Sequence, residues 1–210
     1  MTRFQSRTAE IQDLVLPESS KQMTELVTSQ RDAGPKDITE IPSTLGFISF
    51  GSLLMPTIEG VIVRGEISDA TGQVVSVSFE HDGSSLQVSP FAAPKSEEMW
   101  PDVYAQIKAS IVSSGGSVTE GNGGFGGQLD VSVPTPDGNK EMRFIGVDGP
   151  RWFLRGVITG KALTNSSAAV NMEDIFRSLV VDRGNIPLPP REALPLKLPD
   201  GTFAPPKFDL

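Results

Sequence analysis

FIGVDGPRWFLRGVITG, residues 144–160, is the stretch that decides the predicted fold. Asp148-Gly149-Pro150 is a typical tight-turn sequence, and apolar, aromatic and β-branched residues flank it on both sides. The pattern predicts a hairpin in which Lys140–Val147 pairs with Arg151–Thr159. Because successive side chains of a strand point to opposite faces, Trp152 is expected on the face that packs into the core.

The rest of the chain predicts further strands. Their patterns cover Leu45–Met55, Glu59–Ser68, Gln73–Glu80, Ser85–Phe91, Ser117–Glu120 and Leu129–Val133. Pro90 indicates that the strand containing it lies at a sheet edge or ends there. The glycine-rich segment Gly121–Gly127 is expected to be a flexible hairpin connection.

Two other stretches have the spacing of amphipathic helices. Ser96 is expected to cap the first helix, although Pro101 indicates that regular helix begins only there. Asn171 is expected to cap the second helix, which ends before Gly184. The order of four strands, helix, four strands, helix predicts an α+β fold, an antiparallel β-sheet with helices packed on it. The apolar stripes of the two helices are Trp100, Val103, Tyr104, Ile107, Ile111 and Met172, Ile175, Phe176, Leu179, Val180.

The 210 residues are expected to form one domain with two extensions. Residues 1–39 are expected to be a mobile N-terminal arm and linker, either a solvated tail without a role or a segment that orders on a partner. Residues 40–184 are expected to hold the single α+β domain. Residues 185–210 are Pro-rich and are expected to be an extended C-terminal strap, lying across the domain or across a neighbouring subunit.

Composition disfavours several classes of function. The net charge of −8 repels phosphate backbones and anionic lipid, so neither general nucleic-acid binding nor membrane association is expected. The chain has no Cys and one His, so disulfides, thiolate sites and transition-metal sites are not expected. A carboxylate site for Mg²⁺ or Ca²⁺ is possible, but no D-x-D-x-D-G loop occurs, and neither a metal site nor a cofactor is predicted. The only apolar run near the N-terminus is Leu14–Leu16, much shorter than that of a secretory signal, and the expected location is the cytoplasm.

Two motifs that resemble catalytic or ligand sites are expected to be structural. His81 precedes Asp82-Gly83-Ser84, and the chemistry of a turn explains these residues without a catalytic role. The segment Gly121–Gly127 lacks the Lys and the following helix of a phosphate-binding loop. No catalytic residue is identified, and the protein is not expected to be an enzyme.

Arg151, Phe153 and Arg155 share one face of the predicted strand, and with Arg143 they are the candidate ligand-binding residues. Arg side chains bind carboxylates and phosphates through two parallel hydrogen bonds, and Phe153 would supply an aromatic floor. The alternative is structural: one of Arg151 and Arg155 would pair with a carboxylate, and the other would stack on an aromatic ring or lie in solvent. Candidate carboxylate partners are Glu66, Glu80 and Asp130.

Five segments carry a family resemblance: FGSLLMP (50–56), ATGQVV (70–75), FAAPKS (91–96), GVDGPRWFLRG (146–156) and LPLKLP (194–199). They resemble an actinobacterial family of unknown function, whose genes often lie near the gene for dUTP nucleotidohydrolase. The resemblance covers about residues 34–200, and Asp148–Gly156 is its most specific part. The family has no established activity, so the resemblance implies no functional residue.

The order of the elements is also similar to the PsbP/Mog1-like fold, with a type III secretion chaperone-like fold as the alternative. Proteins of the PsbP/Mog1-like fold have mostly binding and assembly roles, and the similarity implies a role of that kind. We therefore expect a cytoplasmic, non-enzymatic binding or assembly protein that contacts an unidentified protein or a second copy of itself. The alternative is a small-anion or nucleotide-binding protein, in nucleotide metabolism, that uses the Arg-bearing strand face.

Overall fold

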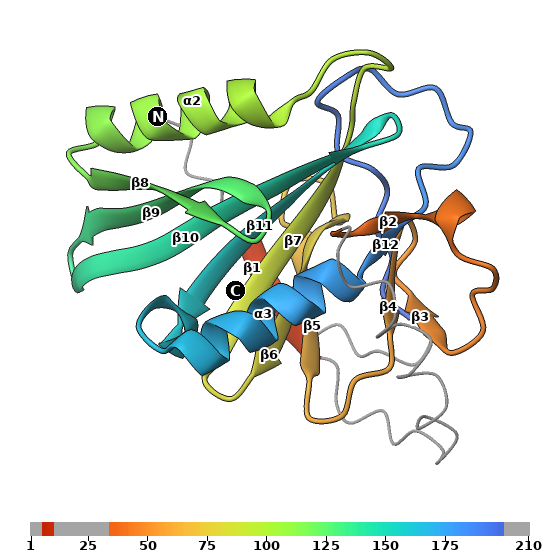
Figure 1. The fold of residues 1–210 in the computed structure, drawn as a ribbon, viewed down its shortest axis with the longest axis horizontal. Coiled ribbons are helices and arrows are strands. Elements are labelled where there is room, and N and C mark those ends of the chain that lie inside the picture. The colour runs from red at the N-terminus through yellow and green to blue at the C-terminus, as the bar shows by residue number, and fades with distance from the viewer. Residues whose placement is uncertain (1–5, 11–33, 200–210) are drawn as a thin grey trace.

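The computed structural model describes residues 6–10 and 34–199, and these form two β-sheets and two α-helices (Figure 1). The helices are α2 (Trp100–Ser113) and α3 (Ser166–Ser178), and short 3-10 turns cover Ile38–Glu40 and Lys161–Leu163. The strands are β1 (Ser6–Glu10), β2 (Lys36–Asp37), β3 (Phe47–Ser49), β4 (Leu53–Pro56), β5 (Ile62–Ser68), β6 (Val74–His81), β7 (Ser84–Ala92), β8 (Ser117–Gly123), β9 (Gly126–Thr135), β10 (Gly138–Gly149), β11 (Trp152–Gly160) and β12 (Val180–Val181).

The predicted α+β class is confirmed. The large sheet has the strand order β1-β5-β6-β7-β11-β10-β9-β8, and every pair of neighbours is antiparallel. The small sheet has the order β2-β12-β4-β3, in which β2 and β12 are parallel. Hairpins between sequence neighbours build most of the large sheet, as the turn signals predict.

The predicted hairpin of residues 144–160 is present as β10 and β11. Gly149 pairs with Trp152, and Pro150 and Arg151 form the turn between them. Arg151 has φ +63°, so it lies in the left-handed region and outside the regular strand. The predicted turn is therefore displaced by about one residue, and Arg151 does not share a strand face with Phe153.

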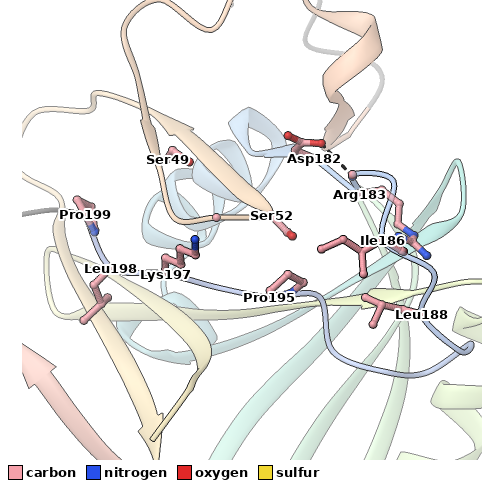
Figure 2. A pocket seen from close by; sticks show the side chains of 12 residues that line it. Ser49, Ser52, Asp182, Arg183, Ile186, Leu188, Pro195, Lys197, Leu198 and Pro199 are labelled. Atoms are coloured by element: carbon pink, nitrogen blue, oxygen red, sulfur yellow. Dashed lines mark hydrogen bonds between the residues drawn. The ribbon is translucent and has the colours of Figure 1, made fainter.

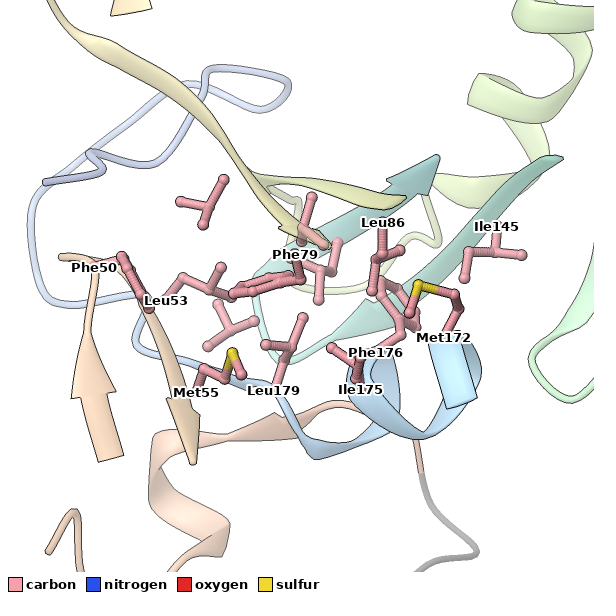
Figure 3. Close-up of a cluster of buried hydrophobic side chains, with 14 of the residues drawn as sticks. Phe50, Leu53, Met55, Phe79, Leu86, Ile145, Met172, Ile175, Phe176 and Leu179 are labelled. Atoms are coloured by element: carbon pink, nitrogen blue, oxygen red, sulfur yellow. The ribbon is translucent and has the colours of Figure 1, made fainter. Parts of the chain in front are cut away.

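The main core lies on the face of the large sheet that carries α3 (Figure 3). Trp152 and Leu154 of β11 pack there, which confirms that Trp152 is a core residue. The small sheet closes the same core, because Leu53 and Met55 of β4 pack into it. Side chains from both sheets and α3 meet in this cluster, including Phe50, Phe79, Leu86, Ile145, Met172, Ile175, Phe176 and Leu179.

A second, smaller cluster lies on the opposite face of the large sheet, beneath α2. Phe153 is its central ring: it stacks on Trp100 of α2 at 5.9 Å between ring centroids and on Phe91 of β7 at 6.1 Å. Gly146 makes this contact possible, because a Cβ atom at that position would overlap the Trp100 indole. Both faces of β11 are thus covered where the strand begins.

The C-terminal strap, residues 185–199 as far as the structure describes it, is part of the sheet architecture. Strands β6 and β7 pair only as far as Val77 and Val88, and the strap lies between the strands beyond that point. Leu194 N donates to the carbonyl oxygen of Pro90 in β7 at 3.0 Å, while Leu196 bridges to β6. Leu194 is 1% exposed and Leu196 is 7% exposed, so both contribute to the core.

The prediction for Pro90 as a sheet-edge residue is wrong, because β7 is a central strand. Pro90 nevertheless lies past the last residue of β7 that pairs with β6, where the strap is the neighbour. At this local end of the β6–β7 ladder a missing N–H is tolerated.

The predicted strand Leu45–Met55 is in fact the hairpin β3–β4. Gly51 lies between the two strands with φ +82°, a conformation that disfavours other residues. A Cβ atom at Gly51 would also lie 2.7 Å from the carbonyl oxygen of Pro195 in the strap. An apolar run hid this turn, because Phe50 and Leu53 on both sides of it are core residues.

The predicted start of α3 is wrong, and so is the predicted cap of α2, although the predicted start of regular helix at Pro101 lies within one residue of the observed one. Helix α3 begins at Ser166, where the Asn165 side chain accepts a hydrogen bond from Ala168 N at 2.9 Å, so Asn171 lies inside the helix. Helix α2 begins at Trp100, and Ser96 does not cap it.

The predicted end of α3 is also wrong. Helix α3 stops at Ser178, and Leu179 is already extended, with ψ 150°. Its buried neighbour Val180 belongs to β12. Leu179 and Val180 are thus apolar because they are buried after the helix ends, and their spacing matches the helical pattern only by coincidence.

None of the described helices is long and apolar enough to cross a membrane.

Candidate anion-binding face of the large sheet

The four predicted ligand-binding residues do not come together in one site. Arg151 is exposed in the β10–β11 turn. Arg143 lies opposite Ile158, a core residue, so it belongs to the α3 face of the sheet. Phe153 and Arg155 lie on the other face, the one covered in part by α2. Of the four, Phe153 and Arg155 remain neighbours.

Arg143 has a structural partner. Its Nε and Nη2 donate to the two carboxylate oxygens of Asp130, at 2.6 and 3.1 Å. The hydrogen bonds that Arg143 donates to Asp130 raise the pKa of Arg143, and burial opposes this effect. This bidentate pair between β10 and β9 occupies the Nε and Nη2 donors of Arg143, which a ligand would otherwise use.

Phe153 is fully enclosed between Trp100 and Phe91, with 1% of its surface exposed. It is a core ring, so it cannot act as an open aromatic floor for a ligand. Phe91, the outer ring of this row, takes that position, because the guanidinium carbon of Arg155 lies 5.3 Å from its centroid.

Arg155 differs from Arg143 in having no counter-ion. Its Nε is buried without a hydrogen-bond partner, and within the described ranges no carboxylate forms an ion pair with it. Burial lowers the pKa of Arg155, yet a guanidinium remains charged at neutral pH. Burying a cation without a counter-ion costs free energy, so the unpaired Arg155 is a candidate ligand-binding group.

The three carboxylates considered as partners for Arg151 or Arg155 are engaged elsewhere. Glu80 accepts from Arg64 Nε at 2.9 Å, and Asp130 binds Arg143. Glu66 accepts from the Ser76 hydroxyl at 2.8 Å and from the Gln87 amide. Neither Arg151 nor Arg155 therefore pairs with one of these carboxylates: Arg155 stacks on Phe91, as the structural alternative expects of one of the two, and Arg151 is exposed.

A row of polar side chains runs across the sheet toward Arg155 on this face. Ser89 of β7 lies directly opposite Arg155, and Ser76 of β6 lies opposite Glu66 of β5. Gln87 of β7 joins the Glu66–Ser76 pair, since its amide donates both to Glu66 and to Ser76 Oγ, the latter at 3.1 Å. This face therefore carries a hydrogen-bonded cluster of Glu66, Ser76 and Gln87, with Ser89 and the Arg155 guanidinium next to it across β7 and β11. We call it the polar face (Glu66, Ser76, Gln87, Ser89, Arg155).

His81 is the last residue of β6 and pairs with Ser84 across the predicted turn, which Asp82 and Gly83 form. Its Nδ1 is 3.0 Å from the carbonyl oxygen of Gly60, and it lines a shallow cavity of about 330 Å³ with Glu80 and Asp82. No group of three or more metal-ligating side chains occurs in the described residues.

The comparison with protein families gives a clear match. The family model described as "Protein of unknown function (DUF3710)" matches residues 34–204. The chain belongs to this family. The match covers the small sheet, both helices, the described part of the strap and every strand of the large sheet except β1, and the predicted membership of a family of unknown function is confirmed. No curated protein and no solved structure matches the chain, so the likeness to the PsbP/Mog1-like fold remains a prediction.

Sequence reasoning missed Gln87 and Ser89 as part of the site. A signal for them exists, because they alternate with the core residues Leu86 and Val88 and so must face away from the main core. Their proximity to Arg155 depends on the pairing of β7 with β11, which are separated by α2, β8, β9 and β10 in the chain.

Proposed function

We propose that this protein binds a small ligand carrying a phosphate or carboxylate group, on the polar face beside Arg155. The supporting observation is the Arg155 guanidinium, which is packed against Phe91 without a carboxylate partner in the part of the chain that the structure describes. An anion would offset the desolvation of this cation, and Ser89 would add a hydroxyl donor opposite it.

Nucleotides are the first ligands to test. The resemblance to an actinobacterial family encoded near dUTP nucleotidohydrolase implies a link to nucleotide metabolism. A nucleotide supplies the phosphate that an unpaired Arg recognises. The cytoplasmic location expected from the sequence is part of this proposal.

Thermal unfolding with added anions tests the proposal. The set comprises inorganic phosphate, pyrophosphate, uridine and adenosine nucleotides, and di- and tricarboxylates. A ligand present at 100 times its dissociation constant stabilises the folded protein by about 2.7 kcal/mol. We expect Arg155→Gln to abolish the stabilisation and Arg155→Lys to weaken it, because Lys lacks the planar fork of donors.

Arg151→Gln is the matched control, since it removes the same charge from an exposed turn of the same hairpin. Equal stabilisation of Arg155→Gln and Arg151→Gln would sink the proposal, as would the absence of any shift with the whole set.

A second candidate function, assembly with a protein partner, rests on a different observation. Strand β8 is one of the two described edge strands of the large sheet, opposite β1, and a partner strand could pair with its edge. We expect a charge at the edge, Thr119→Lys, to remove such an interaction without unfolding the domain. A partner that is retained by Thr119→Lys in sizing chromatography would bind elsewhere.

A further inference from the structure

A groove of about 690 Å³ beside the strap does not direct its polar groups to one point. Figure 2 shows the Arg183 guanidinium apart from Lys197 and Ser52. Side chains do converge at the tip of the β8–β9 hairpin, where Phe125 meets α3 at the rim of the main core. This contact, and not the groove, brings defined groups around a volume the size of one aromatic ring.

The tip of the hairpin is built almost entirely of glycine. Five of the seven residues 121–127 are Gly, and Asn122 and Phe125 carry the side chains of this segment. Gly124 and Phe125 form the turn, and Gly126 follows with φ +87°, a conformation that disfavours other residues. Because glycine has many accessible backbone conformations, fixing this tip against α3 costs more entropy than fixing an ordinary hairpin.

The Phe125 ring holds the tip on α3. It meets Phe176 edge-on, with 5.0 Å between ring centroids and 78° between ring planes. The guanidinium carbon of Arg177 lies 4.9 Å from the centroid of the Phe125 ring. Gly34 closes another side, because a Cβ atom there would lie 3.8 Å from the ring. In the described part of the chain no hydrogen bond joins residues 123–126 to α3, so the ring is the main attachment.

The base of the hairpin is fixed to α2 instead, and β8 runs alongside this helix (Figure 1). Trp100 Nε1 donates to the carbonyl oxygen of Gly127 at 2.9 Å, and the Tyr104 hydroxyl donates to Glu120 at 2.9 Å. Bending within residues 121–127 therefore lifts Phe125 from α3 while the rest of the hairpin stays in place.

We propose that the volume filled by the Phe125 ring is a binding site for a small neutral aromatic molecule, and that Phe125 is a plug which leaves when this ligand binds. The ligand ring takes the same position, with its edge against Phe176 and its face toward Arg177. Arg177 already pairs with Asp174 at 2.9 Å, so the site does not require a charged ligand. A guanidinium favours rings rich in electron density, and phenols are therefore the ligand class.

The crowding around Gly124 favours a free ring over a peptide. A Cβ atom at Gly124 would lie 2.8 Å from Arg177 Nη2 and 2.9 Å from Glu173 Oε2. A chain that carries its own aromatic side chain to this place needs a glycine beside it, whereas a phenol needs only the volume of the ring. The site contacts α3, so it is separate from the polar face around Arg155 and does not depend on the function proposed there.

Titration of the full chain with p-cresol, followed by NMR, tests the proposal. A ligand that binds only the open form has an apparent Kd equal to its intrinsic Kd divided by the open fraction. With the open form populated at about 0.1–10%, Phe125→Ala should bind p-cresol about 10- to 1,000-fold more tightly than the wild type. Phe125 is only half-buried, so this variant keeps the fold. Methylcyclohexane, which has no π-electrons, should bind more weakly than p-cresol to both proteins.

A disulfide lock tests the movement of the plug in an otherwise intact site. The chain has no Cys, so Gly124→Cys combined with Glu173→Cys introduces a single pair, at positions that lie close together. The oxidised protein should bind p-cresol at least tenfold more weakly than the wild type, and dithiothreitol should restore binding. Gly127→Ala needs no disulfide: its Cβ atom lies 3.6 Å from Tyr104, an ordinary contact. By stiffening the open hairpin it should weaken binding about two- to fivefold.

Binding of p-cresol by Phe125→Ala and not by the wild type would reveal only a cavity made by the substitution, and would overturn the proposal. Equal affinity of these two proteins, undiminished binding by the oxidised lock, or no binding by either protein would overturn it as well. Arg155→Gln should bind p-cresol as the wild type does, so this result is distinguishable from that of the anion titrations.

Discussion

Asp37 shows how one buried carboxylate is held by distant parts of the chain. Thr39 donates to its Oδ1 twice, from the backbone at 3.0 Å and from the hydroxyl at 2.7 Å. The Trp152 indole donates to its Oδ2 at 2.8 Å. Because Asp37 belongs to the small sheet and Trp152 to the large one, this hydrogen bond connects the two sheets inside the core.

This carboxylate gives stability a defined dependence on pH. Burial raises the pKa of Asp37, but the hydrogen bonds from Thr39 and Trp152 outweigh burial, so its folded-state pKa lies below 3.8. The stabilisation is therefore present above the unfolded pKa of 3.8 and is lost as pH falls through the folded-state value. We expect Asp37→Asn to cost about 1–3 kcal/mol at pH 7 and less below pH 4.

Urea unfolding at pH 7 and between pH 3 and 4 measures this difference. Asp137→Asn is the control, because Asp137 lies in an exposed turn. A difference between wild type and Asp37→Asn that stays constant with pH would show that Asp37 is not held as its anion.

At the level of the elements, helix α2 depends on a residue that lies far from it in the chain. The carboxylate of Asp148 accepts hydrogen bonds from Met99 N at 2.8 Å and from Trp100 N at 2.9 Å. Asp148 comes from the end of β10, so the hairpin also supplies the helix cap. An acid at this end of a helix is further favoured by the helix dipole.

We expect Asp148→Ala to destabilise the protein by about 0.5–2 kcal/mol, because two N–H groups at the helix start lose their acceptor. Ser96→Ala should have no measurable effect, since Ser96 makes no cap hydrogen bond. Urea unfolding of the two variants compares the two caps. A larger loss for Ser96→Ala than for Asp148→Ala would contradict this assignment.

The sequence could predict an element where its determinants are close together in the chain, and could not where they are distant. The β10–β11 hairpin follows from the local alternation of side chains and a turn motif, and 17 residues are enough to set the register of its two strands. The cap of α2 could not be found in that way, because its acceptor is 48 residues away. Helix α3 was misplaced for a similar reason: Leu179 and Val180 are apolar for the small sheet and not for the helix.

The candidate site follows the same division. The alternation of β11 alone identifies Arg155 as a candidate. That it has no carboxylate partner follows only from the structure, in which Glu66, Glu80 and Asp130 bind other residues. Gln87 and Ser89 join it through a pairing between β7 and β11. Long-range pairing of this kind depends on packing and is not encoded by a local pattern.

For the whole molecule, the strap should be essential to stability. Removal of residues 191–210 takes away two buried leucines, Leu194 and Leu196, each of which contributes about 1.5–3 kcal/mol. The sum, about 3–6 kcal/mol, is a large part of the total stability of a typical domain, about 5–15 kcal/mol, so we expect this truncated chain to be strongly destabilised.

Removal of residues 200–210 is the matched control, because it keeps the contacts that the described part of the strap makes with β6, β7 and the β3–β4 turn. Circular dichroism and urea unfolding distinguish the two truncations. Equal stability of both would show that the strap is not part of the folded core.

The position of the strap between β6 and β7 also has a consequence during synthesis. These two strands are complete on the ribosome when Ala92 has been added, whereas Leu196 follows about a hundred residues later. At a synthesis rate of about 5–20 residues per second, roughly 5–20 s pass between completion of β6 and β7 and synthesis of the strap segment that lies between their ends. During that interval the nascent chain exposes unpaired strand edges, and a chaperone that recognises them would protect this protein before its last residues arrive.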